Sequence, residues 1–300
     1  MTLSQPHQCT IASTRMLLRA PTPADDKYSR GVVGIRTGSH RYPGAAVIGV
    51  EGAWRSGVGM VRYVGEAAGE VLARRPETVI GTGRCEAWVV GSGTDAAERS
   101  ANDTAQLQQL MSGHAPVVVD AGAIDLGVQA ALRGDGAPLV FTPHAGEFAR
   151  LCAAQSWTDC QLPSAENASA ASPSAVLAQR AQVVARAAER LQQTVVLKGY
   201  STLIAAPGEH VYCVESATPW LAVAGAGDVL GGVIGAVIAQ HPDAAVHDAA
   251  AAAVWLHGHA ARIAAGVAGT DAGIGRPIVA MDVAEALPYA VHEVLTHDAE

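Results

Sequence analysis

One stretch decides the fold of this chain: Ala222-Val-Ala-Gly-Ala-Gly-Asp-Val-Leu-Gly-Gly-Val-Ile-Gly-Ala-Val-Ile-Ala-Gln240. Its second half predicts a helix, because apolar residues recur at the spacing of one buried face, at Leu230, Val233, Ile234, Val237 and Ile238. The small residues before them predict a loop, and we expect Asp228 to be the N-cap. The backbone N–H groups of Gly225 and Gly227 would then lie at the positive end of the helix, which predicts an anion site suited to phosphate.

Asp228 is an unusual residue beside a phosphate-binding loop, because like charges repel. The position makes chemical sense if the carboxylate takes a proton from a substrate while the loop holds the phosphate. The alternative is that Asp228 only caps a buried helix, and a short glycine motif on its own favours that alternative. The motifs in the rest of the chain favour the catalytic interpretation.

Composition excludes several classes of protein. The chain has 300 residues, of which 49% are hydrophobic, and this supports a large core. The net charge of −8 and the pI near 5.7 argue against a nucleic-acid partner. The five cysteines include no Cys-x-x-Cys pair and predict reduced thiols in a cytoplasmic protein. No continuous apolar leader begins the chain, and the apolar run over 217–240 carries Asp228 and many glycines, so no membrane partner is expected.

Short β-branched segments alternate with helical segments, which predicts one α/β domain with a mainly parallel sheet covered on both faces. We expect residues 1–26 to form an N-terminal arm that is loose or partly docked, residues 27–300 to form the domain, and residues 155–172 to form a surface loop. Polar or glycine positions follow several strand segments, at Gly91, Asp120, Thr142–Glu147, Lys198 and Gly225–Asp228. Ligands of open α/β sheets bind at the carboxyl ends of strands, so these positions predict one binding edge.

The segment Thr142-Pro-His-Ala-Gly-Glu147 at this edge holds a rigid turn, an imidazole and a carboxylate. It would present His144 to a substrate and place Glu147 near bound phosphates or their metal. The alternative is a helix that begins at a proline, with Glu147 in its first turn, and both descriptions can hold. Tyr42-Pro-Gly-Ala-Ala46 predicts another helix start, whose small residues would let a flat ligand lie against the backbone.

The segment Lys198-Gly-Tyr-Ser-Thr202 follows a buried strand and is a candidate nucleotide site. Lys198 would supply charge for phosphate, Gly199 would allow close approach of the backbone, and Ser201 and Thr202 would donate hydroxyl hydrogen bonds. The alternative is a lysine at an ordinary hairpin turn, and the segment alone leaves the two interpretations even.

Taken together, these motifs resemble those of the ADP/ATP-dependent NAD(P)H-hydrate dehydratases, a family of the ribokinase-like superfamily. The matching segments follow the family order between residues 27 and 265 and are Lys27-Tyr-Ser-Arg-Gly31, Tyr42-Pro-Gly-Ala-Ala46, Ser56-Gly-Val-Gly-Met-Val61, Val90-Gly-Ser-Gly93, Thr142-Pro-His-Ala-Gly-Glu147, Lys198-Gly-Tyr-Ser-Thr202 and Gly225-Ala-Gly-Asp-Val-Leu230. The resemblance implies a three-layer α/β/α fold. It also implies an enzyme that restores NADH or NADPH from the hydrated forms NADHX or NADPHX. ADP or ATP would phosphorylate the ring hydroxyl, and phosphate would then be eliminated.

The resemblance implies roles for individual residues. Asp228 would be the general base, and an anion hole would be formed by Gly225, Ala226 and Gly227. The substrate would contact Ala46, Gly93, His144 and Asp228. The nucleotide would contact Lys198, Gly199, Tyr200, Ser201, Thr202 and Gly227. Mg²⁺ would bridge the phosphates, with Glu147 as an indirect neighbour.

The chain departs from the family pattern in three places. Gly122 replaces the second Asp of the family's Asp-Ala-Asp-Ala-Leu, so Asp120 is given no catalytic role. Ala226 replaces a Thr, and the Gly91–Gly93 loop is shorter than the family's Gly-Pro-Gly-Leu-Gly. The 26 residues before Lys27 are too few for the epimerase domain that many relatives carry, so we expect a separate epimerase.

Two other functions stay open at this point. One is a kinase of the same superfamily that phosphorylates a vitamin-precursor alcohol, and the other is a non-catalytic sensor that binds a nucleotide. Asp228 argues against the sensor, because a protein that only binds nucleotide needs no base beside the phosphate. The resemblance also implies a homo-oligomer, often a tetramer.

Overall fold

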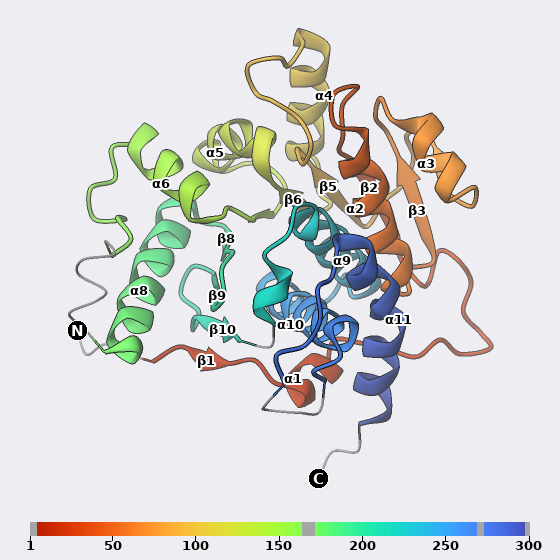
Figure 1. Ribbon diagram of the computed structural model, residues 1–300. Helices are drawn as coiled ribbons and strands as arrows, with labels where there is room; N and C mark the ends of the chain where they lie inside the picture. Colours follow the sequence, from red (N-terminus) through yellow and green to blue (C-terminus); the bar gives the residue numbers. More distant parts are fainter. Residues whose placement is uncertain (1–4, 164–171, 216, 269–272, 298–300) are drawn as a thin grey trace.

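The fold is given by a computed structural model that describes residues 5–163, 172–215, 217–268 and 273–297. In this part of the chain one sheet has ten strands, in the order β1-β10-β9-β8-β7-β6-β5-β2-β3-β4 (Figure 1). The strands are β1 (His7–Gln8), β2 (Val32–Arg36), β3 (Met60–Tyr63), β4 (Val79–Ile80), β5 (Ala87–Val90), β6 (Val117–Val119), β7 (Leu139–Phe141), β8 (Thr194–Leu197), β9 (Thr202–Ala205) and β10 (Tyr212–Val214).

Among these described strands, β9 alone runs against the others. It is antiparallel to β8 and to β10, whereas the remaining neighbours are parallel. The sheet is therefore mainly parallel, which confirms the predicted fold class, and β9 and β10 form a hairpin. Because β9 reverses direction, the β8–β9 turn lies at the carboxyl edge of the parallel strands, and the β9–β10 turn, residues 206–211, lies at the opposite edge.

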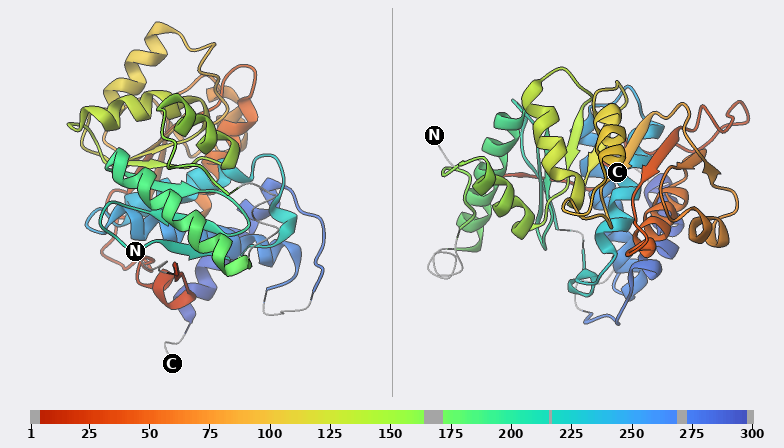
Figure 2. Two further views of the ribbon diagram at one scale, coloured as in Figure 1. Left: turned by 90° about the vertical axis from the view of Figure 1, so that its left-hand side faces the viewer. Right: turned by 90° about the horizontal axis from the view of Figure 1, so that it is seen from above.

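Helices cover both faces of the sheet (Figure 2). They are α1 (Ile11–Arg15), α2 (Pro43–Arg55), α3 (Ala68–Arg74), α4 (Ala101–Met111), α5 (Ile124–Arg133), α6 (Ala145–Ala154), α8 (Pro173–Leu191), α9 (Ala226–Gln240), α10 (Val246–Ala265) and α11 (Ala280–Thr296). Helices α2, α9, α10 and α11 pack on one another over one face, and α4, α5, α6 and α8 cover the other. The architecture is the predicted α/β/α arrangement of three layers.

Successive residues of the central strands enter two separate cores. In β5, Val89 packs with the α2, α9, α10 and α11 layer, whereas Val90 packs with the opposite layer. In β7, Val140 and Phe141 divide in the same way. Both faces of the sheet are therefore apolar, which explains why these strands are continuous runs of β-branched residues.

Helices α2 and α9 approach each other at glycines. A Cβ atom placed on Gly232 would lie 2.1 Å from the carbonyl oxygen of Gly49, and one on Gly52 would lie 2.5 Å from that of Val229. Real Cβ atoms do not come this close to a carbonyl, so the two helices touch through their backbones. The first turn of α9 is thereby fixed against α2.

The segment before Lys27 is partly docked on this body. Strand β1 pairs with β10 at the end of the sheet, and α1 packs against α10 and α11. Within the predicted surface loop over 155–172, residues 164–171 lie outside the described residues. All five cysteines are unpaired, as predicted. In the described part of the chain, every helix is too short or too polar to cross a membrane.

Candidate active site

The first turn of α9 carries the predicted anion loop, with one correction. Gly225 is the N-cap, in the left-handed conformation with φ of 87°, and Asp228 is the third residue of the helix. The prediction that Asp228 is the N-cap was wrong, because Gly225 adopts a backbone conformation that lets the helix begin three residues earlier. The first N–H groups of a helix have no partner within it, so the Gly227 and Asp228 amides can donate to an anion here.

The Gly225 position leaves no room for a side chain. A Cβ atom there would lie 2.9 Å from both Ile48 Cδ1 of α2 and Ala280 Cβ of α11. The same Cβ would lie 3.8 Å from Asp228 Oδ2, so the Asp228 carboxylate folds back over the loop. The Asp228 carboxylate and the predicted anion site are therefore adjacent.

Asp228 is held by a residue that the sequence did not indicate. Ser92 is buried in the turn after β5, and its hydroxyl donates a hydrogen bond to Asp228 Oδ1. The pKa of Asp228 is raised to about 6 overall. Burial has the largest effect and raises the pKa, and the Asp120 carboxylate raises it further, whereas the Ser92 hydrogen bond and Lys198 lower it. A carboxyl whose pKa lies near 6 is ionised at neutral pH and still accepts a proton readily, as a general base must.

Lys198, at the end of β8, lies in a polar cluster with Asp120 and Thr142. Lys198 Nζ is 2.7 Å from Asp120 Oδ1, and Thr142 Oγ1 donates to the same oxygen at 2.9 Å. Asp120 is only 4% exposed, so its charge is balanced by the lysine inside the protein. A Cβ on Gly227 would lie 3.5 Å from Lys198 Nζ, which places the ammonium group beside the anion loop. Asp120, which the sequence analysis gave no catalytic role, thus holds Lys198 at the loop.

His144 and Glu147 form the start of α6. His144 is the N-cap, and its Nδ1 accepts hydrogen bonds from the amides of Gly146 at 3.0 Å and Glu147 at 3.4 Å. Glu147 Oε2 accepts from the His144 amide at 2.8 Å and lies 4.0 Å from Lys198 Nζ. The segment therefore starts a helix with Glu147 in its first turn, as one interpretation predicted, and contacts of His144 with a substrate and of Glu147 with phosphates stay predictions.

A cavity of about 540 Å³ opens between the Lys198 cluster and the anion loop. We call it the Lys198 cavity; its lining includes His144, Lys198, Gly199, Tyr200, Thr202, Leu221, Gly227 and His257. Its lining combines polar positions, such as Lys198 and Gly227, with apolar side chains, such as Val214, Pro219 and Leu221. The cavity has the size and the mixed lining of a small-molecule site.

The predicted nucleotide residues other than Ser201 line this cavity, and the hydroxyl groups of Ser201 and Thr202 have partners within the protein. Thr202 Oγ1 donates to the Gly199 carbonyl at 2.9 Å, and Ser201 Oγ donates to Glu215 Oε1 at 2.6 Å. The Tyr200 side chain is largely exposed. These hydrogen bonds close the β8–β9 turn. It therefore stays a prediction that Ser201 and Thr202 donate hydrogen bonds to a nucleotide.

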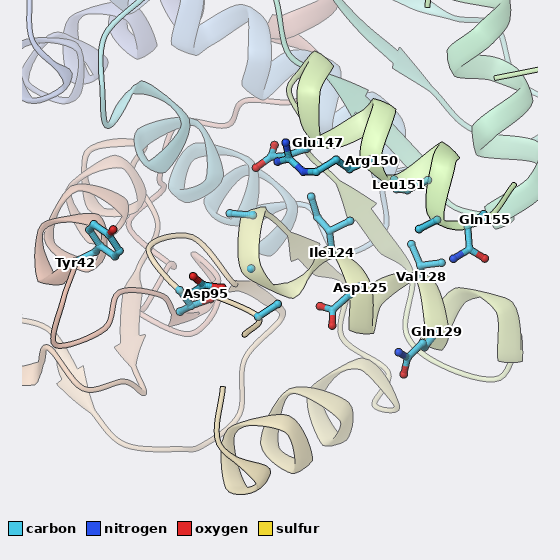
Figure 3. A pocket seen from close by; sticks show the side chains of 15 residues that line it. Tyr42, Asp95, Ile124, Asp125, Val128, Gln129, Glu147, Arg150, Leu151 and Gln155 are labelled. Atoms are coloured by element: carbon cyan, nitrogen blue, oxygen red, sulfur yellow. The ribbon is translucent and has the colours of Figure 1, made fainter. Parts of the chain in front are cut away.

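A second cavity, of about 570 Å³, lies between α5 and α6 and reaches Tyr42 (Figure 3). We call it the Tyr42 cavity. Its apolar wall is formed by Ile124, Val128 and Leu151, and Glu147 and Arg150 project from α6 at its rim. Thr94, which follows the turn that holds Asp228, also lines it. The two cavities therefore lie on either side of the α6 start.

Two predicted substrate residues, Ala46 and Gly93, are not part of the lining of either cavity. Ala46 is fully buried. A Cβ on Gly93, which has φ of 67°, would lie 2.4 Å from Ala45 Cβ. The turn over Gly91–Gly93 therefore packs directly on the start of α2, and a substrate contact at Ala46 or Gly93 stays a prediction.

The carboxylates around the loop suit a magnesium ion that arrives with phosphates. Mg²⁺ in nucleotide sites keeps several waters and takes one or two carboxylates in addition to phosphate oxygens. Asp120, Glu147 and Asp228 are near the loop, but Asp120 is bound to Lys198 and Glu147 caps α6. The donor set fits an ion held mainly through phosphates, and Glu147 stays an indirect neighbour.

Comparison with known proteins assigns the chain to a family. The family model described as NAD(P)H-hydrate dehydratase matches residues 33–274. The chain belongs to this family. Relatives support the assignment: the ADP-dependent (S)-NAD(P)H-hydrate dehydratase of Neisseria meningitidis is 34% identical over 86% of this chain and 85% of its own length.

Other relatives of this chain are longer. The bifunctional NAD(P)H-hydrate repair enzyme Nnr of Mycobacterium tuberculosis is 40% identical over 227 residues, which are 73% of this chain and 43% of that enzyme. The chain thus spans about half the length of the first curated relatives it matches. Among solved structures, the Bacillus subtilis ADP/ATP-dependent NAD(P)H-hydrate dehydratase crystallised with ATP and Mg²⁺ has a TM-score of 0.77 at 23% identity, covering 96% of this chain and 99% of its own. That similarity establishes the ribokinase-like fold.

Proposed function

We propose that this chain is an ADP-dependent (S)-NAD(P)H-hydrate dehydratase, which repairs NADHX and NADPHX to NADH and NADPH. One observation carries the proposal: a half-buried carboxylate, Asp228, whose pKa is raised to about 6, lies directly over an anion loop at a helix N-terminus. A general base beside a phosphate site is what transfer of a phosphoryl group to a hydroxyl requires. The name of the Neisseria meningitidis relative supports ADP as the donor.

The adenine nucleotide would occupy the Lys198 cavity. Its base would lie against apolar side chains of the lining, such as Val214 and Leu221, and its phosphates would reach Lys198 and the Gly227 amide. The hydrated nicotinamide would enter from the Tyr42 cavity, so that the ring hydroxyl meets Asp228 and the rest of the dinucleotide lies along α5 and α6. The α6 start, with His144 at one cavity and Glu147 at the other, would separate the two ligands.

The reaction would proceed in two steps. Asp228 takes the proton of the ring hydroxyl while the hydroxyl oxygen bonds to the terminal phosphorus of the nucleotide, and the bond from that phosphorus to the bridging oxygen breaks. The Gly225–Gly227 loop and Lys198 stabilise the charge on the transferred group. Phosphate then leaves the ring carbon and a proton leaves the neighbouring carbon, which restores the double bond. Mg²⁺, when bound with the nucleotide, would neutralise phosphate charge.

The decisive experiment is to incubate the chain with ADP or ATP and NADHX of mixed epimers and to follow the return of nicotinamide absorbance. A site that places the hydroxyl between Asp228 and the donor phosphorus accepts one face of the ring, because a misplacement of about 1 Å costs roughly a hundredfold in rate. We therefore expect a fast phase that consumes the S epimer and a slow phase limited by epimerisation. Added epimerase should merge the phases.

The outcomes separate this function from its alternatives. A stable phosphorylated product with no return of absorbance would identify a small-molecule kinase. Nucleotide binding without turnover of any hydrated cofactor would identify a sensor. Loss of both epimers at one enzyme-dependent rate would contradict the proposed geometry around Asp228.

A further inference from the structure

A cluster of metal-ligand side chains lies outside the active site. Glu209 and His210 occupy the β9–β10 turn, and His247 lies in the first turn of α10. One potential ligand atom from each of the three lies within 4.8 Å of the others. These three residues, which we call the His247 cluster, are joined by β9 and α10 to the active site but lie at the opposite edge of the sheet.

His247 is an unusual residue for a buried position. It is only 6% exposed, and its Nε2 has no hydrogen-bond partner among the described residues. Asp248 Oδ1 lies 3.3 Å from Nε2, outside hydrogen-bond geometry, and accepts a hydrogen bond from the Tyr212 hydroxyl at 2.8 Å. Buried polar atoms are almost always satisfied, so an unpartnered imidazole nitrogen needs an explanation.

The surroundings of His247 bring further rings and negative charge together. His210 lies edge-on to His247 with ring centroids 5.8 Å apart, and His7 of β1 stacks on His210 at 4.3 Å. Tyr212 lies against His247, with centroids 5.5 Å apart. The cluster is thus backed by packed rings on one side, and its two nearby carboxylates, Glu209 and Asp248, favour a cation.

We propose that Glu209, His210 and His247 bind a divalent transition-metal ion, with Zn²⁺ as the best fit. Two imidazoles and one carboxylate form a ligand set that suits zinc, whereas Mg²⁺ and Ca²⁺ prefer oxygen ligands alone. Ligands about 2.0 Å from a tetrahedral zinc lie about 3.3 Å apart, so the exposed Glu209 and His210 side chains must move inward by only about 1–1.5 Å. A water molecule would complete the fourth position.

The role of this metal is structural. The ligands come from the β9–β10 turn and from the start of α10, and the backbone of His7 is hydrogen-bonded to Val211 at 2.8 Å. A metal would therefore fasten the end of the sheet, with β1 beside it, to α10. The reaction proposed above does not need this ion, because Asp228 and Lys198 lie at the other edge of the sheet.

The test uses the intact chain, stripped of metal by a chelator, with zinc chloride alone and no nucleotide. Titration calorimetry should show one zinc per chain, and thermal melting should show a higher Tm with zinc than without it. Glu209→Gln and His210→Gln change exposed side chains and should each weaken zinc binding at least about tenfold. His40→Gln is the matched control, since His40 is exposed and lies 3.9 Å from Glu66 with no third potential ligand among the described residues, and this variant should bind zinc like the parent chain.

Cobalt substitution identifies the ligands. Co²⁺ in the site should give the visible absorption of tetrahedral nitrogen and oxygen coordination, without the charge-transfer absorption of a thiolate. Equal zinc affinity in the parent, Glu209→Gln and His210→Gln would overturn the proposal, as would a thiolate spectrum or the absence of stoichiometric zinc binding.

Discussion

Ser92→Ala should move the pH dependence of the enzyme toward higher pH. Ser92 is buried, and its hydroxyl donates to Asp228 Oδ1, which favours the ionised carboxylate. A hydrogen bond to a charged group is worth about 1.5–3 kcal/mol, and one pKa unit corresponds to about 1.4 kcal/mol. Lys198 continues to favour the ionised form, so we expect the pKa of Asp228 to rise by about one unit.

The assay is the pH profile of kcat/KM for NADHX. In the parent chain the base is ionised above its pKa of about 6, so activity should rise as pH increases through that value. In Ser92→Ala the rise should be centred near pH 7, which lowers activity about tenfold near pH 5 and leaves it nearly equal near pH 9. Ser112→Ala, which removes an exposed hydroxyl bonded only to the Gln108 carbonyl among the described residues, is the control and should keep the parent profile.

Two results would refute this reasoning. An acid limb that moves to lower pH would mean that Ser92 favours the protonated carboxyl. Activity that falls equally at every pH would mean that Ser92 shapes the turn over Gly91–Gly93 and does not set the pKa of Asp228.

The other predictions concern the loop and its partners. Asp228→Asn should lower turnover by on the order of a hundred- to ten-thousand-fold, and calorimetry should show unchanged nucleotide affinity. Near-normal turnover in this variant would show that Asp228 is not the general base. The same variant should resist denaturant better than the parent at pH 8 by on the order of 1–3 kcal/mol. The reason is that the pKa of Asp228 rises from 3.8 to about 6 on folding. The stability that the parent gains from protonated Asp228 is therefore complete below about pH 4 and is lost as pH rises through about 6. An equal stability advantage of Asp228→Asn over the parent at pH 4 would contradict this reasoning. Gly227→Val should abolish nucleotide binding in calorimetry, because the valine side chain would fill the space beside Lys198 Nζ, from which even a Cβ at this position would be only 3.5 Å away. Retained nucleotide affinity would mean that the phosphates lie elsewhere. Lys198→Ala should weaken nucleotide binding more than substrate binding. Equal weakening of both would favour the alternative that Lys198 is only a residue of an ordinary hairpin turn.

Much of the fold could be predicted from local patterns. The β-branched runs of β5 and β7 and the apolar face of α9 follow from residues close in the chain, and the structure has these elements where the patterns predict them. Helices α1, α3, α5 and α11 were not predicted; α1 and α3 are short, with five and seven residues. α11 contains Pro288, and α5 follows directly on a 3-10 turn over Ala121–Ala123, so the start or the interior of each helix is irregular.

The site was predictable only where its chemistry lies within one short segment. The Gly225–Gly227 loop and the His144–Glu147 segment could be identified because their residues are adjacent. Ser92 was missed because its partner Asp228 is 136 positions away, and no spacing rule relates them. The N-cap of α9 was misplaced because Asp and Gly both occur at N-caps, and only the backbone geometry distinguishes them.

The close approach of α2 and α9 at Gly52 and Gly232 has a consequence for how this chain can change. Directed evolution commonly improves enzymes by adding or enlarging side chains near the site, but an added carbon at either of these two glycines would push α9 away from α2 and carry Asp228 away from Ser92. Variation that retunes the pKa of Asp228 must therefore come from the loops over 91–94 and 142–147. Libraries that hold the two glycines constant should contain a larger share of active clones than libraries of equal size that randomise them.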